Sequence, residues 1–291
     1  MNSSIYPTSP APYDDEGAYP KPRWKLLRSW LKLPRPTHRF APRLSFNAAS
    51  DTPPPELAAH WGEHVLIEDN VTVLHRDGTS TWRLHFVTQL AGANELAAWD
   101  ELWRSYDIRT EKHRVVTARL LTPGGGWRKA SQKVHTVPSP GTTGNVYGRA
   151  IQLGFHPLRP GVIVELEETY DRFRVDQFGP TIANQIYLRT GSPCRRRRFV
   201  MAVARPFTLN YELHHGASPP VERQVGEYRV YTWEVTDAEG VEVDDWTPPP
   251  RDHVPWVDVS TAKSWAPFAA QFRQELEPPT IAGHDIRQIA D

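Results

Sequence analysis

The sequence predicts a mainly β protein: an antiparallel β-sandwich with one short inserted helix and a helix near the C-terminus. From residue 64 onward, short segments alternate apolar and polar residues, and turns containing Gly or Pro separate them. No regular series of helices alternates with these segments, which favours packed antiparallel sheets over a parallel α/β sheet. The predicted organisation is a Pro-rich, basic, largely irregular arm (1–58), a sandwich (59–262), a helix (263–277), and a linker that starts a further domain (278–291).

Composition narrows the class of partner. Among 291 residues, Lys+Arg and Asp+Glu both number 34, so no overall field attracts nucleic acid. No run of 18 apolar residues is present, which predicts no transmembrane segment. The first residues lack the basic and apolar regions of a secretory signal. We therefore expect a cytoplasmic protein, and an extracytoplasmic location stays open.

The arm contains a basic segment, residues 21–43, with eight lysines and arginines and no acidic residue. Trp24, Leu27 and Leu31 recur at helical spacing within it. One interpretation is a basic amphipathic helix on a membrane surface or partner. The other, which we favour because so short a helix is marginal alone, is an arm that packs on its own domain.

The first strands of the predicted sandwich form a hairpin over residues 68–90, with its turn at Asp77-Gly78. The next segment, 93–107, changes to three- and four-residue spacing and predicts the inserted helix. Its apolar residues are Leu96, Trp99, Trp103 and Tyr106.

A second hairpin is predicted where 113–121 and 127–136 flank the turn TPGGG. Segment 161–173 then alternates strictly, which predicts a strand with one dry and one wet face. The dry face carries Val162, Val164, Leu166 and Tyr170, and the wet face carries Glu165, Glu167 and Asp171.

Later strands are predicted from RRFVMAVARPF, TLNYEL and EYRVYTWEV, with Tyr231, Trp233 and Val235 in phase, and the last from PWVDVS. Ser264 can then cap a helix whose apolar stripe is the candidate docking surface for another domain. The stripe consists of Trp265, Phe268, Phe272 and Leu276.

Four segments carry a resemblance to a known family. HVLIEDNVTVLHRDGTSTWRLHFVTQL, VTARLLTPGGGW, RPGVIVELEETYD and VPWVDVSTAKSWAPFAAQF occur in this order over residues 62–276. The chain resembles the bacterial domain of unknown function that precedes transglutaminase-like catalytic domains.

This resemblance implies a non-catalytic accessory β-sandwich module, not an enzyme, without a cofactor. It implies that the module orients or recruits a transglutaminase-like domain, in cis or as a separate chain, and the protein or peptide substrate of that domain. Residues 280–291 resemble the entrance to that domain, which this sequence does not contain.

The single cysteine, Cys194, is the only candidate nucleophile of the type such a domain uses. Arg195 to Arg198 follow it directly and can lower a thiol pKa. Alternatively, these arginines begin a strand in which Cys194 is a small filler, and we favour this interpretation.

Metal and carboxylate sites receive little support. His214 and His215 are adjacent, so on a strand they face opposite sides. A proline-rich stretch is flanked by four possible ligands, Asp244, Asp245, Asp252 and His253. Such a stretch is typical of an exposed loop. Glu165, Glu167 and Glu168 resemble a glycosidase pair in spacing, but a solvated face is the simpler interpretation.

Eleven tryptophans suggest a second function, a stand-alone carbohydrate-binding sandwich. Most of them are in phase with apolar neighbours, which indicates core packing. Trp127 and Trp246 stand beside predicted loops and are the candidate exposed aromatics.

Overall fold

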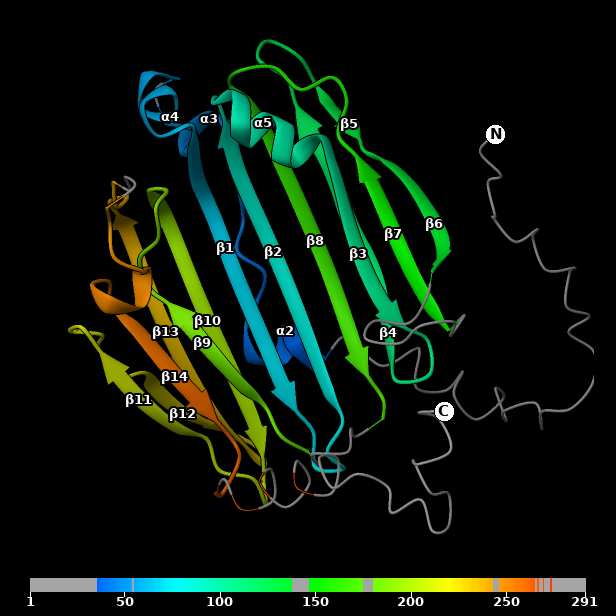
Figure 1. Ribbon diagram of the computed structural model, residues 1–291, viewed down its shortest axis with the longest axis vertical. Helices are drawn as coiled ribbons and strands as arrows, with labels where there is room; N and C mark the ends of the chain where they lie inside the picture. Colours follow the sequence, from blue (N-terminus) through cyan, green and yellow to red (C-terminus); the bar gives the residue numbers. More distant parts are fainter. Residues whose placement is uncertain are drawn as a thin grey trace, which may run out of the picture. The chain divides into compact units, whose positions relative to one another are not determined.

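One large sheet forms the centre of the structure, a computed structural model that describes residues 36–53, 55–137, 147–174, 180–242 and 246–264 and three single residues beyond them. The sheet has eight strands in the order β12-β13-β10-β1-β2-β8-β4-β5 (Figure 1). In that order the strands are Val221–Val225, Tyr228–Ala238, Cys194–Ala204, Glu63–Leu74, Ser80–Leu90, Val162–Arg172, Glu111–Leu121 and Trp127–Lys129.

The described residues also form two smaller sheets of three strands each. The first has the order β11-β14-β9, with strands Asn210–His214, Trp256–Ser260 and Ala183–Tyr187. The second has the order β3-β7-β6, with strands Glu101–Asp107, Gly148–Gly154 and Ser131–Val137. The predicted mainly β fold is confirmed.

Helices in the described residues are short. They are α2 (Pro36–Phe40), α3 (Ala48–Asp51), α4 (Pro55–Trp61), α5 (Ala93–Asp100) and the 3₁₀ turn η1 (Pro250–Asp252). Most of the C-terminal helix predicted over 263–277 lies outside the described residues. Residues 21–34 lie wholly outside them, so neither interpretation of that basic segment, a helix on a partner or an arm packed on its own domain, is tested.

The inserted helix is confirmed only in its first part. Helix α5 ends at Asp100, and the chain continues directly as β3. Trp103 and Tyr106 therefore belong to a strand and point to opposite faces, contrary to the sequence prediction. Their helical spacing misled because pairing with β7 along the whole of β3 outweighs the local pattern.

Both predicted hairpins are confirmed. Asp77 closes the turn between β1 and β2 by accepting hydrogen bonds from the backbone and the hydroxyl of Thr79, and Gly78 has φ +85°. Strand β4 pairs with β5 across the glycine-rich turn. Beyond Ala130, however, the chain leaves the large sheet and enters the small one as β6. One neighbouring pair, β1 and β10, is parallel, so the prediction of a wholly antiparallel structure is wrong there.

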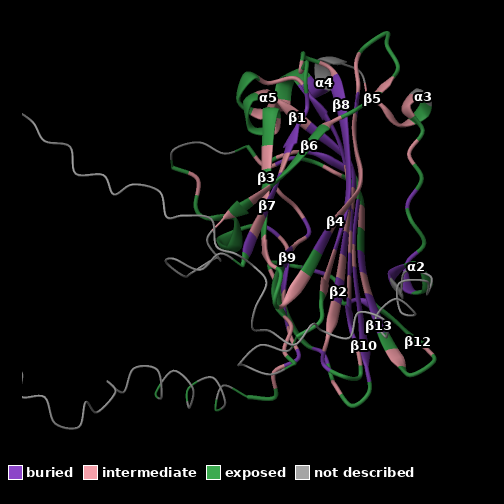
Figure 2. Ribbon diagram, turned by 90° about the vertical axis from the view of Figure 1, so that its right-hand side faces the viewer, coloured by how far each residue is buried: buried purple, intermediate pink, exposed green. Residues whose placement is uncertain are grey.

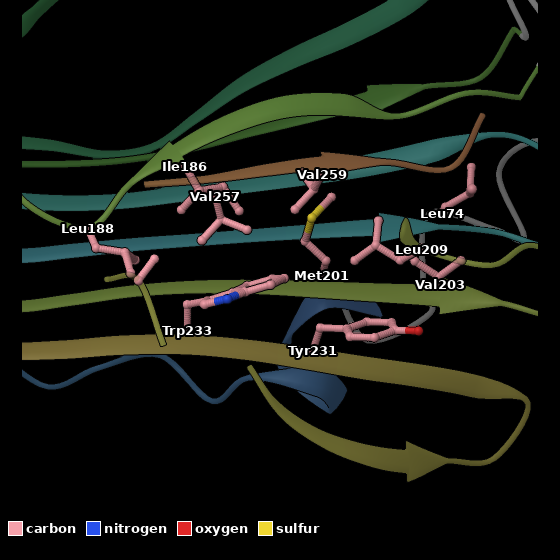
Figure 3. Packing of buried hydrophobic residues seen from close by; sticks show 11 residues of the cluster. Leu74, Ile186, Leu188, Met201, Val203, Leu209, Tyr231, Trp233, Val257 and Val259 are labelled. Carbon is pink, nitrogen blue, oxygen red and sulfur yellow. The ribbon is translucent and has the colours of Figure 1, made fainter. Parts of the chain in front are cut away.

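Two apolar cores lie between the large sheet and the small sheets that pack on it. The first joins β9 and β14 to β10 and β13 (Figure 3), where Trp233 and Tyr231 lie in phase as predicted. The second joins β7 to β2, β4 and β8 through residues such as Leu153 and Leu166. Each small sheet thus covers its own part of the same face.

The opposite face of the large sheet is covered by residues 36–53, which we name the strap. Figure 2 shows α2 and α3 on the side of the sheet away from β3, β7 and β9. Phe40 packs there against strands β1, β10 and β13, and Leu44 packs against β1, β2 and β8. Both faces of the sheet are therefore buried over much of its area.

Candidate functional site

A layer of buried ionic groups lies between the strap and the large sheet. Asp69 on β1 accepts hydrogen bonds from Arg83 on β2 at 2.8 Å and from Arg198 on β10 at 2.8 and 2.9 Å. The side chains of Asp69 and Arg83 are completely inaccessible to water. Neighbouring strands present these residues on one face, so the sheet itself fixes the cluster.

The same arginines hold the strap in place. Arg83 donates to the carbonyl of Ala41 at 3.1 Å, and Arg198 donates to that of Pro42 at 2.7 Å. Arg223 on β12 donates to the carbonyl of Phe40. Three consecutive carbonyls of the strap are thus satisfied by guanidinium groups of the large sheet, as a buried irregular segment requires.

A second ionic cluster is centred on Glu165. Its carboxylate accepts hydrogen bonds from Arg119 at 2.6 Å, from Arg43 of the strap, and pairs with His85 at 3.0 Å. Burial alone raises the pKa of Glu165, but hydrogen bonds from His85 and Arg119 outweigh it and hold the pKa below its usual range. A general acid needs the opposite shift, so this carboxylate is suited to binding cations and not to donating a proton.

The predicted wet face of β8 is therefore wrong. Glu165 and Glu167 alternate with the apolar residues as expected, but only 1% and 3% of their surface is exposed. The strap covers them, and Arg43 lies 3.3 Å from Glu167. Alternation correctly separated the two faces but contained no information on the segment that covers the second one.

Glu168 was predicted to be solvated but is buried too, on the side of β8 that faces the small sheet β3-β7-β6. It accepts hydrogen bonds from Arg104 at 3.1 Å and pairs with His113 at 3.1 Å. The ring of His113 stacks on Tyr170, with centroids 3.9 Å apart. Burial raises the pKa of Glu168, and the partners His113 and Arg104 more than reverse this, so its pKa is lowered.

Cys194 begins β10 and is 1% exposed, as expected for a small filler. Burial raises the pKa of its thiol to about 11, and the opposing effect of Arg197 is smaller. The thiol is therefore protonated at neutral pH, and the alternative of a thiolate activated by the four arginines is wrong. A protonated, buried thiol is a poor nucleophile.

This shift predicts a loss of stability at high pH. The pKa of Cys194 is higher in the folded protein than its ordinary value of 9.0. The contribution of the protonated thiol to the free energy of unfolding is therefore fully present below pH 9 and is lost as the pH rises toward 11. Urea unfolding at pH 8 and at about pH 10.5 should show that the parent chain loses about 2 kcal/mol more than Cys194→Ala between the two conditions. Equal losses, or rapid labelling by a thiol reagent at pH 8 without urea, contradict the buried protonated thiol.

A groove of about 680 Å³ lies beside Cys194, where β10 begins and β13 ends. Trp61, Val254 and Val241 contribute apolar surface to it, and His64 lines both this groove and an adjoining cavity of about 470 Å³. His64 is 8% exposed, and within the described residues its Nδ1 has no hydrogen-bond partner. Burial, with a contribution from Arg195, lowers the pKa of His64, so the groove presents a neutral imidazole.

The candidate exposed aromatics differ in their surroundings. Trp246 is 91% exposed, as predicted. Trp127 is half-buried: Phe46 of the strap meets it edge-on, and the guanidinium of Arg119 lies 4.0 Å from its ring centroid. The prediction of an exposed Trp127 is wrong, because the strap again covers this part of the sheet. Sequence reasoning placed Trp103 in a helix and so missed a tryptophan that the sheet exposes.

The docking stripe and the metal candidates have separate outcomes. The four residues of the stripe lie outside the described residues, so the stripe stays a prediction: Trp265, Phe268, Phe272 and Leu276.

The part of the chain that the structure describes holds no group of three His, Cys, Asp or Glu side chains placed to bind a metal. His214 instead stacks on Trp256, with centroids 3.9 Å apart. None of the helices in the described ranges is long and apolar enough to cross a membrane.

Comparison with known proteins gives a family and a fold. The model of a family described as a domain of unknown function with solved structure (DUF3857) matches residues 76–242. No curated protein matches the sequence.

Among solved structures, a protein from Parabacteroides distasonis ATCC 8503 named as a "putative protease" is similar with a TM-score of 0.63 and 14% identity. The match covers 73% of this chain and 43% of that chain. A two-domain M1 zinc metallopeptidase bound to L-tryptophan (TM-score 0.34, 11% identity, 69% and 43% covered) and yeast LTA4 hydrolase with bestatin (0.29, 12%, 78% and 33%) are also found. This chain spans less than half of each of these structures, and only the first likeness has a score high enough to indicate a shared fold.

Proposed function

Because this chain belongs to the DUF3857 family, a domain of unknown function, we propose that it is a non-catalytic accessory module of a larger protein-processing assembly. The observation that carries this proposal is the likeness to the Parabacteroides protein, in which the shared fold accounts for 43% of that chain. A fold that recurs as part of a longer protein is suited to positioning a neighbour. We also propose that the large sheet and the two small sheets packed on it form a β-sandwich.

The chemistry of the only thiol supports this role. The sequence contains one cysteine, and that cysteine is buried and protonated at neutral pH. Any reaction through a cysteine nucleophile therefore needs a thiol from another domain. We propose a transglutaminase-like domain, in cis or as a separate chain, together with its protein or peptide substrate. Bacterial origin and a cytoplasmic location stay predictions from the sequence.

Association with such a domain tests the proposal. The full chain is mixed with a purified transglutaminase-like domain, and the complex is measured by size-exclusion chromatography and calorimetry. We expect a stable complex, with affinity lowered about tenfold or more by Phe268→Asp together with Phe272→Asp in the predicted stripe.

Val221→Asp is the matched control, because it places the same charge on an apolar residue that is 71% exposed on the edge strand β12. This variant should bind like the parent chain. Absence of any complex, with the domain fused or added separately, would rule out the accessory role.

One of the two aromatics predicted for the alternative, a stand-alone carbohydrate-binding module, is less accessible than expected, since Trp127 is half-buried against Phe46 of the strap. A third tryptophan, Trp103, is exposed on another sheet and supports a saccharide site that does not depend on a catalytic partner.

A further inference from the structure

The outer face of the small sheet β3-β7-β6 carries an exposed tryptophan among polar side chains. Ile151 and Leu153 of β7 point into the core, so their neighbour Gln152 faces outward. Trp103 of β3 is directly opposite Gln152 on one side, and Lys133 of β6 is opposite it on the other. These three residues therefore form one row across the outer face.

Hydrogen bonds connect the polar groups around this tryptophan. The indole nitrogen of Trp103 donates to Glu101 at 3.2 Å, and the amide of Gln152 donates to the other oxygen of the same carboxylate. Nε2 of His135 lies 2.8 Å from Oε1 of Gln152, and its ring lies 5.0 Å from Trp103. Side chains from three strands are thus fixed relative to one another, and the indole keeps no unpaired polar atom.

The other small sheet shows what a purely structural tryptophan looks like in the same setting. Trp256 stands in the central strand of β11-β14-β9, with His214 stacked at 3.9 Å on one side and Tyr187 at 6.0 Å on the other. Only 8% of its surface is exposed, whereas 46% of Trp103 is exposed. Among the described residues β3 is an edge strand of its sheet, so Trp103 has a paired strand on one side only, and on that side the ring of His135 lies 5.0 Å away and tilted, not stacked.

We propose that this platform of Trp103, Glu101, Gln152, Lys133 and His135 binds a neutral saccharide. A sugar ring presents C–H groups to the face of an aromatic ring and hydroxyl groups at its rim, where each acts as donor and acceptor. The platform offers the matching arrangement: an aromatic surface, a carboxylate and an amide oxygen as acceptors, and amide and ammonium groups as donors.

The mixed charge of the platform selects a neutral ligand. Glu101 and Lys133 carry opposite charges on adjacent rows, so neither an anionic nor a cationic polymer meets a surface of one sign. A single large aromatic surrounded by such groups is also too polar for the apolar centre of a stable protein interface. This binding needs no catalytic partner, so its failure and the failure of the accessory role are distinguishable.

The test uses the full chain on a printed array of neutral oligosaccharides, followed by native gels that contain soluble dextran or mannan. We expect retention by at least one of these glycans and a loss of affinity of about tenfold or more in Trp103→Ala, since stacking area is removed. Glu101→Gln should weaken the same binding about threefold or more, because a charged acceptor becomes neutral. Unchanged thermal unfolding of both variants confirms that the fold is intact.

Trp246→Ala is the control, because Trp246 is more exposed than Trp103 and belongs to no strand of this sheet. It should bind every glycan as the parent chain does. The proposal is overturned if no array member or polysaccharide is retained, if Trp103→Ala binds normally, or if Trp246→Ala is the variant that loses binding.

Discussion

Replacing Asp69 with alanine should destabilise the protein by about 3–5 kcal/mol, because it removes the carboxylate that two buried guanidinium groups share. Arg83 and Arg198 both depend on this carboxylate, and the side chain of Arg83 is completely inaccessible to water. The strap carbonyls of Ala41 and Pro42 still accept hydrogen bonds from these arginines but carry no charge, and the attraction of Glu167 remains for Arg83. Urea unfolding monitored by tryptophan fluorescence measures the loss as a lower midpoint with an unchanged slope.

An exposed ion pair between β10 and β13 provides the comparison. Arg196 of β10 lies 2.7 Å from Glu234 of β13, but their side chains are 45% and 34% exposed. Glu234→Ala should therefore cost about 1 kcal/mol or less, since water screens such a pair. Similar losses in the two variants would mean that the charges near Asp69 are solvated in solution and that the strap does not cover them.

The strap marks the boundary of what the sequence could predict. Alternation along β8, the Asp77-Gly78 turn and the in-phase Tyr231 and Trp233 all follow from local spacing, and each is confirmed. The burial of Glu165 depends instead on Arg43, which is 122 residues away in the sequence. No local pattern contains that contact.

The exposed tryptophan was missed for a related reason. Trp103 stands at helical spacing from Trp99, and only the pairing of β3 with β7 turns its side chain outward. An edge strand is defined by the absence of a neighbour, which spacing within one segment cannot reveal. The spacing within one segment thus predicted which residues share a face of a strand, whereas the segments that cover a sheet and the strands at its edge could not be predicted from it.

Phe40→Ala should destabilise the protein by about 3–5 kcal/mol, because it removes the apolar side chain that fastens the strap to the sheet. Phe40 is 2% exposed and packs against Val71, Val200 and Val230 of three strands. Phe46→Ala is the matched control at the margin of the strap, where the ring is half-buried against Trp127. Urea unfolding should show a clearly smaller loss in this variant.

The two largest effects should also be coupled, since Phe40 and the ionic cluster depend on the same segment. Once Phe40→Ala loosens the strap, water reaches Arg83 and Arg198, and the further loss of Asp69 leaves less charge buried. The double variant should therefore lose less stability than the sum of the single losses, by about 1 kcal/mol or more. Strict additivity would show that the charged cluster is held by the sheet alone, and that the strap covers the sheet without controlling its electrostatics.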